Sequence, residues 1–256
     1  MANNCYTKYR FEGPEAEIRY MGNRLLETFA RHPFEEADAE TRYYSSKEYY
    51  EQNFSHIVDA LYPGTEGGRG AVRGKITEES YRSLGDGTLV LAFETKSAYV
   101  PENIIWDEVL RQWAPNSRYY YYAEELALEG AWTNDVYRKY FPWDYVVYAR
   151  VEQPMPDVIF DFLTKNAVFR EDQYAMHATY WRKDELRKAL LKLLPHPEWS
   201  TDNLIYVARK ELERFAEAQN MWIQFFTISH HLEDEPELYS EEDYERASSG
   251  RKPDWE

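Results

Sequence analysis

The feature that most constrains this chain is a high content of large aromatic side chains within a strongly acidic sequence. The 256 residues include 23 tyrosines, 12 phenylalanines and 8 tryptophans, and they carry a formal net charge of -16. Acidic chains that are poor in aromatic residues stay disordered, because they bury too little apolar surface to offset chain entropy. Each buried ring removes roughly 150–250 Å² from water, so this sequence predicts a folded core beneath a negative, tyrosine-bearing surface.

The charge balance limits the partners that the chain is expected to bind. Acidic residues outnumber lysine and arginine by 46 to 30, which disfavours nucleic acid and anionic membranes because phosphate recognition needs clustered cations. No stretch approaches the roughly 20 apolar residues that span a bilayer, and the N-terminus lacks the apolar segment of a signal peptide. The single cysteine, Cys5, has no partner for an internal disulfide. We therefore expect a cytoplasmic protein without membrane contact.

The first 150 residues predict alternating strands and helices. Strands are expected from β propensity and turn signals at 5–12, 75–81, 88–95, 118–125 and 128–132. Helices are expected after Pro14, after a capping box that begins at Ser45, and from Pro101. The resulting order, β-α-(α)-β-β-α-β, is the ferredoxin-like order, in which helices cover one face of an antiparallel sheet.

Apolar residues at helical spacing predict which face of two helices is buried. On the helix after Pro14 the expected core residues are Ile18, Met21, Leu25, Leu26 and Phe29. On the helix from Pro101 they are Ile104, Ile105, Val109, Leu110 and Trp113. Both sets contain intervals of three and four residues, the spacing that lines one side of a helix.

After about residue 150 the pattern changes, and three regions are predicted. Residues 1–150 are expected to form the ferredoxin-like domain, 151–231 a mainly helical region with one buried strand at 221–228, and 232–256 an acidic tail. Helices of the middle region are expected at 157–165, at 183–194 and from Ser200. The tail contains 10 acids and 3 bases, and the sequence shows no internal repeat.

Part of the first region resembles a known family. The elements that carry the resemblance are a strand through Phe93 and Thr95, a tryptophan-rich helix that starts at Pro101, and an aromatic strand that runs to Glu125 and Gly130. Together with the opening segment FEGPEAEI, they resemble the YubB-type ferredoxin-like domain of plasmid, phage and conjugative-element proteins. The resemblance covers roughly the first 150 residues. It implies a ferredoxin-like fold and a mobile-element setting, and it implies no activity.

Two patterns suggest catalysis or metal binding, and each has a plainer reading. Adjacent acids such as Glu124-Glu125 could serve acid–base catalysis, but neighbours on a strand point to opposite faces, and solvated side chains are the default expectation. His230-His231 could bind a divalent metal, yet no cysteine or third histidine lies at ligand spacing. We therefore predict no catalytic residue, no metal ligand and no cofactor.

Other local patterns favour structure or flexibility over chemistry. The glycine-rich segment 64–74 lacks the full phosphate-binding pattern GxxxxGK[ST] and is expected to be a flexible connector. The tyrosine run 119–122 could stack bases, but no basic groove is expected beside it. Alternate tyrosines should instead pack inside, while the others form an exposed strip suited to a protein interface. Cys5 is expected to be inert and His177 to be packed among aromatic rings.

These observations predict an α+β protein that works by binding a basic protein surface. In its sharpest form, the hypothesis is a mobile-element inhibitor that occupies the nucleic-acid groove of a host defence protein. The residues expected to contact the partner are Glu35, Glu36, Asp38, Glu40, Glu233, Asp234, Glu235, Tyr239, Glu241, Glu242, Asp243 and Tyr244. Three alternatives stay open: a metal- or carboxylate-dependent hydrolase or nuclease, a homo-oligomer that uses its tyrosine face, and acidity that only maintains solubility.

Overall fold

The architecture is known from a computed structural model. It describes residues 4–31, 53–63, 74–98, 100–125, 130–150, 155–164, 167–170, 176–218 and 222–230. Within these ranges the protein is α+β, with six helices and nine strands. No helix in the described ranges is both long and apolar enough to span a bilayer.

The elements fall into two halves, each of which has helices after its first strand and before its last strand. The first half contains β1 (Asn4–Pro14), α1 (Glu15–Ala30), α4 (Phe54–Leu61), β2 (Gly74–Ser83), β3 (Thr88–Ala98), α5 (Asn103–Trp113) and β4 (Arg118–Glu125). A short strand, β5 (Gly130–Thr133), follows. The second half contains β6 (Tyr145–Arg150), α6 (Asp157–Thr164), β7 (Val168–Arg170), β8 (Met176–Trp181), α7 (Lys183–Leu193), α8 (Thr201–Ala218) and β9 (Trp222–His230).

All described strands belong to one sheet, in the order β2-β3-β1-β4-β5-β9-β6-β8-β7. The order on one side of β5 mirrors the order on the other, since β6, β7, β8 and β9 take the places of β1, β2, β3 and β4. Pairing within each half is antiparallel, and only the β5–β9 pairing is parallel. The sheet is therefore mixed, and it is larger than the four-stranded sheet of a ferredoxin-like fold.

The prediction of a single strand in the mainly helical region 151–231 was wrong, because the described part of this region contains three strands. Besides the buried strand at its end, which became β9, it contains β7 and β8, and β6 pairs with both β8 and β9. The boundary at residue 150 therefore cuts the second half directly after its first strand, and the structural repeat was missed. Strand β7 has only three residues, and both faces of β8 are largely covered, so neither shows the alternation that predicts a strand.

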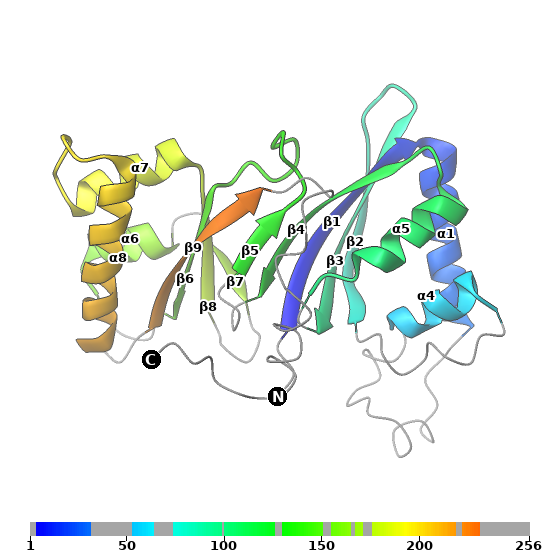
Figure 1. Ribbon diagram of the computed structural model, residues 1–256, viewed down its shortest axis with the longest axis horizontal. Coiled ribbons are helices and arrows are strands. Elements are labelled where there is room, and N and C mark those ends of the chain that lie inside the picture. The colour runs from blue at the N-terminus through cyan, green and yellow to red at the C-terminus, as the bar shows by residue number, and fades with distance from the viewer. Residues whose placement is uncertain are drawn as a thin grey trace, which may run out of the picture.

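Each half buries a core between its helices and its part of the sheet. In the first half this core is aromatic, because rings from the strands surround Trp106 of α5 with centroids 4.9–5.6 Å away: Tyr9, Phe11 and Phe93. In the second half it includes four leucines of α7 and α8: Leu186, Leu190, Leu204 and Leu212. Figure 1 shows the two groups of helices at opposite ends of the molecule, with the sheet between them.

The helix-free faces of the two halves form a third, inner core. Its buried apolar residues are Tyr122, Ala131, Phe141, Val146, Tyr148, Met176, Ala178, Phe226 and Ile228. Strand alternation produces this arrangement, since Tyr121 belongs to the helix-side core of the first half while the next residue, Tyr122, belongs to the inner core. The same alternation applies to Val147 and Val146 in β6.

The sheet must curl to close this inner core. Four strands separate β1 from β8, so a flat sheet would hold them about 24 Å apart at about 4.8 Å per strand. Yet the amine of Lys8 on β1 lies 5.3 Å from the ring centroid of Tyr180 on β8. The two halves therefore face each other across the concave side of the sheet.

The predicted buried faces of α1 and α5 need two corrections. Leu26 is 54% exposed and Ile104 is 80% exposed, although both were expected in the core. On α5 the fully buried position is Trp106 instead, since the helix is rotated to place the indole against the aromatic strands. Helix α4 is capped by Asn53, whose side chain accepts a hydrogen bond from the backbone of Ser55. The predicted cap at Ser45 lies outside the described residues.

Candidate functional site

The predicted partner-binding residues lie outside the described ranges. They are Glu35, Glu36, Asp38, Glu40, Glu233, Asp234, Glu235, Tyr239, Glu241, Glu242, Asp243 and Tyr244. By sequence, the described ranges contain 25 acids and 22 bases, a balance of -3 against -16 for the whole chain. The remaining -13 therefore belongs to the other segments, so the charge of this protein is segregated along its sequence.

On the outer helices, carboxylates alternate with cations. Arg19 pairs with Glu15 on α1 at 2.7 Å, and Arg111 pairs with Glu108 on α5 at 2.6 Å. Pairs of this kind also occur on α8, between Arg209 and Glu213 and between Arg214 and Glu211. Exposed pairs each contribute little to stability, but they keep the described scaffold near charge balance.

The tyrosine run on β4 forms no exposed strip. Tyr119 and Tyr121 pack against the first-half helices as predicted, but Tyr122 is fully buried in the inner core and Tyr120 is half-buried. The expectation that alternate rings would face solvent was wrong because the curled sheet covers its own helix-free face. This covering depends on strands far apart in the sequence, which local alternation does not reveal.

A buried carboxylate, Glu124, organises the centre of the inner core. Its Oε2 atom accepts a hydrogen bond from the hydroxyl of Tyr122 at 2.9 Å, a second from Tyr148, and a longer one from Tyr180 at 3.4 Å. These tyrosines come from β4, β6 and β8, so the carboxylate joins the two halves. Burial, and then the nearby charge of Glu124, raises the pKa of the Tyr122 phenol well above its ordinary value. We call these four residues the Glu124 cluster.

A second polar group, the Glu12 cluster, lies on the same face of the first half. Glu12 accepts hydrogen bonds from Tyr140 at 2.6 Å, from Arg118 at 3.1 Å and from Lys139. Burial alone would raise the pKa of Glu12, but these donors outweigh it and lower the pKa to about 2. The carboxylate of Glu12 is therefore ionised at neutral pH and hydrogen-bonded to these three side chains.

The loop between β5 and β6 supplies two of the three partners of Glu12, Lys139 and Tyr140. Its conformation is fixed by Asp135, whose carboxylate accepts backbone hydrogen bonds from Lys139, Tyr140 and Phe141 at 2.6–3.0 Å. Arg138 in this loop has a positive φ of 56°, and its backbone N–H donates to the carbonyl of Asp135. The loop thus turns Lys139 and Tyr140 inward, and Arg138 toward the second half.

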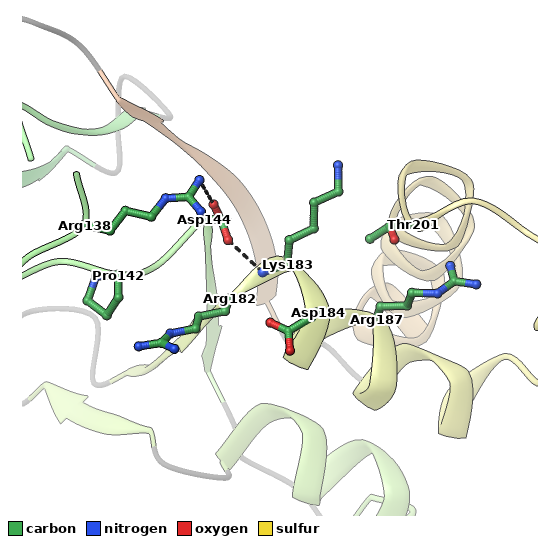
Figure 2. Close-up of a pocket in the computed structure, with 8 residues that line it drawn as sticks. All are labelled: Arg138, Pro142, Asp144, Arg182, Lys183, Asp184, Arg187 and Thr201. Atoms are coloured by element: carbon green, nitrogen blue, oxygen red, sulfur yellow. Dashed lines mark hydrogen bonds and ion pairs between the residues drawn. The ribbon is translucent and has the colours of Figure 1, made fainter. Parts of the chain in front are cut away.

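An open pocket of about 620 Å³ lies where this loop meets the starts of α7 and α8 (Figure 2). We call it the basic pocket, and its lining residues are Arg138, Pro142, Asp144, Arg182, Lys183, Asp184, Arg187 and Thr201. Four of these side chains are cationic and two are acidic, which is unusual in a chain with so large a negative charge. No sequence motif connects the loop with α7, so sequence reasoning missed this site.

Asp144 is the structural centre of the basic pocket. Its carboxylate pairs with the guanidinium of Arg138 at 2.5 Å and accepts a hydrogen bond from the backbone N–H of Lys183 at 2.8 Å. Figure 2 shows Asp144 between these two residues, with Arg187 and Thr201 farther along the pocket. The negative charge of Asp144 is therefore compensated within the protein.

The other described residues considered as catalytic or metal-binding candidates are buried or hydrogen-bonded within the fold. Glu124 and Glu125 are both about 1% exposed, so the expectation of solvated side chains was wrong. They do face opposite sides of the sheet, since Glu125 lies across from Cys5 of the helix-side core. Burial raises the pKa of the Cys5 thiol to about 12, which agrees with an unreactive cysteine. A ring nitrogen of His230 lies 3.1 Å from the carbonyl oxygen of Trp143.

Comparisons with known proteins return no relative. No family model matches the chain, and a search of curated proteins finds no significant match. Among the residues with described positions, no group of three or more histidine, cysteine or carboxylate side chains is arranged to hold a metal ion. The segment 64–73, His231 and the acidic tail fall outside those positions.

Proposed function

We propose that this protein is a binding protein, in which a near-neutral scaffold carries acidic segments that engage a basic protein surface. The observation that supports this proposal is the charge segregation: a balance of -3 in the described ranges and -13 in the rest of the chain. Charge that merely maintains solubility has no need to be concentrated in a few segments. Concentrated charge steers association with an oppositely charged surface and makes binding sensitive to salt.

We further propose that each half is a ferredoxin-like unit. The arrangement β2-β3-β1-β4 in the first half, with helices on one face, supports this assignment, and the second half has the matching order β7-β8-β6-β9. The first unit is the part of the chain that resembles the YubB-type domain. That resemblance suggests a plasmid or phage setting for the protein.

In such a setting, the sharpest form of the proposal is an inhibitor that competes with nucleic acid. Duplex DNA presents one negative charge per roughly 1.7 Å of axis, and clustered carboxylates can attract the same lysine and arginine side chains. The buried acids give less support to the alternative of a carboxylate-dependent hydrolase. Glu12 and Glu124 are each held by donors of the protein itself instead of facing an open cleft.

The test is affinity capture from a bacterial lysate with the full chain and two matched variants. The first variant changes six acids of the tail to amides: Glu233, Asp234, Glu235, Glu241, Glu242 and Asp243. The second makes the same change at six exposed acids of the scaffold: Glu79, Asp86, Asp157, Asp161, Glu211 and Glu217. Both variants remove the same charge, so only the position of the charge differs.

We expect the full chain and the scaffold variant to capture basic proteins that duplex DNA displaces and that high salt releases. The tail variant should lose this capture by roughly tenfold, because only that variant removes the concentrated charge. Equal loss in both variants would attribute the effect to net charge alone. Capture of acidic proteins, or capture that ignores salt, would overturn the proposal.

A further inference from the structure

We propose that the basic pocket binds the phosphate group of a small soluble phosphate ester. This goes beyond the proposed function, because the pocket is cationic while the proposed partner surface is anionic. It also rests on different residues, all of which are described by the structure. The charged side chains that line the pocket, and the ion pairs that already neutralise some of them, support this proposal.

The two acids of the pocket are both engaged by cations of the protein. Asp144 pairs with Arg138 at 2.5 Å, and Asp184 pairs with Lys188 of the next helical turn at 3.5 Å. Lys188 is not a lining residue. The cations Arg182, Lys183 and Arg187 therefore outnumber the negative charge that remains available inside the pocket.

Arg187 is held in place without losing its charge. Its Nη1 donates to the carbonyl oxygen of Trp199 at 2.7 Å, and its Nη2 donates to that of Pro197 at 3.0 Å. Carbonyl groups are neutral, so the guanidinium is positioned but its positive charge is not compensated. Fixed guanidinium groups are preferred for phosphate because their donors match its oxygens.

Arg182 completes the excess of positive charge. Among the described residues, its guanidinium makes no hydrogen bond and no ion pair. Lys183 has one exposed ion pair, with Asp202 at 3.3 Å. Figure 2 shows the ends of Arg182, Lys183 and Arg187 pointing in different directions, so binding requires the first two to turn toward the ligand. Both are exposed, so their side chains are free to turn, and the turn costs them part of their conformational freedom.

The position of these cations is unfavourable unless an anion is nearby. Arg182 and Lys183 stand at the start of α7, where the positive partial charge of the helix repels cations, and the acids Asp184 and Glu185 of the first turn offset only part of this charge. Arg138 adds a second cost, since a positive φ is unfavourable for a residue with a side chain. Local costs of this kind tend to accumulate at binding sites. Asp144 offsets part of the charge, and a phosphate group would offset the rest.

The experiment titrates inorganic phosphate into ¹⁵N-labelled protein at constant ionic strength and follows the NMR signals of the pocket. We expect saturable shifts of the Lys183, Arg187 and Thr201 signals, with a Kd on the order of 1 mM. Acetate at the same ionic strength should produce no saturable shift. Equal shifts with acetate, or shifts that do not saturate, would overturn the proposal.

Two pocket variants and one control variant test whether phosphate binds at the basic pocket. Arg182→Ser and Arg187→Met should each weaken phosphate binding by about tenfold, the effect of one charge-assisted hydrogen bond. Lys210→Met removes the same charge from an exposed position on α8, and it should change binding less than about twofold. Arg187→Met disturbs the connection before α8 through its bonds to Pro197 and Trp199. Arg182→Ser, which removes no side-chain hydrogen bond or ion pair of the described residues, is therefore the deciding variant. Unchanged binding in that variant would contradict the proposal.

Discussion

The two halves of this protein have the same strand order, but the side chains on their inner faces differ in chemical character. In the first half the helix-free face carries Lys8, Arg10 and Glu12, whereas in the second half it carries mainly apolar rings and aliphatic side chains such as Tyr148 and Phe226. The charged face meets the aromatic one through cation–π contacts, including that of Lys8 with Tyr180. One topology can therefore bury two chemically different faces when each complements the other.

The outer cores differ as well. Stacked and tilted rings fill the space beneath α1 and α5, while the second half combines leucines from α7 and α8 with a smaller stack of Phe162, Trp181 and Phe225. This difference explains why the sequence shows no repeat. Topology depends on where apolar residues recur, and it places few demands on which apolar residues they are.

The largest effect is expected from a substitution that disrupts the aromatic core of the first half. Trp106→Ala should lower the free energy of unfolding by about 3–5 kcal/mol, because it removes a fully buried indole and leaves a cavity. Leu190→Ala, the matched change in the second half, should cost about 2–5 kcal/mol. Urea unfolding followed by circular dichroism measures both. A cost below 1 kcal/mol for either variant would show that the corresponding core is not packed as described.

An intermediate effect is expected where the two halves meet. Tyr148→Phe removes a hydrogen bond to the buried carboxylate of Glu124, and it should cost about 1–3 kcal/mol. The control is Tyr206→Phe on the exposed side of α8, which should stay within about 0.5 kcal/mol. A double-mutant cycle with Glu124→Gln should show coupling between the two residues. Additive costs in that cycle would mean that the hydroxyl and the carboxylate do not interact.

The smallest effect concerns the charged face of the first half and depends on pH. The pKa of Glu12 lies at about 2, below its ordinary 4.5. Its ionised form is therefore favoured by folding, and this contribution is present above about pH 4.5 and lost as the pH falls toward 2. Because Arg118 and Lys139 are partly exposed, the contribution should be on the order of 1 kcal/mol.

Thermal unfolding of Glu12→Gln against the unmodified protein isolates this contribution. The difference in stability between the two should be largest near neutral pH and should shrink as the pH falls from about 4.5 toward 2. A difference that stays constant over this range would show that the charge of Glu12 does not stabilise the fold.

Local patterns in the sequence were sufficient to predict most elements of the first half. Alternating residues marked β3, β propensity marked β4, and the glycines at 85 and 87 marked the turn between β2 and β3, where both have positive φ. The exposure of Leu26 and Ile104 was not predicted, because apolar spacing does not distinguish a core residue from an apolar residue at the edge of the core.

The parts that were missed depend on contacts between distant segments. The curl of the sheet, the Glu124 cluster and the basic pocket each combine residues from elements far apart in the chain. The start of α7 gives no local signal for the pocket, because the cations Arg182 and Lys183 are followed directly by Asp184 and Glu185, the acids expected in the first turn of a helix.

The most direct test of the central claim, that two matching halves form one sheet closed on its inner face, is native-state hydrogen exchange. The claim predicts that amides of β1 and β6 exchange with the same free energy of opening, and that Tyr148→Phe lowers protection equally in both strands. If the substitution lowers protection in β6 and leaves β1 unchanged, the two halves are independent and the inner core does not join them.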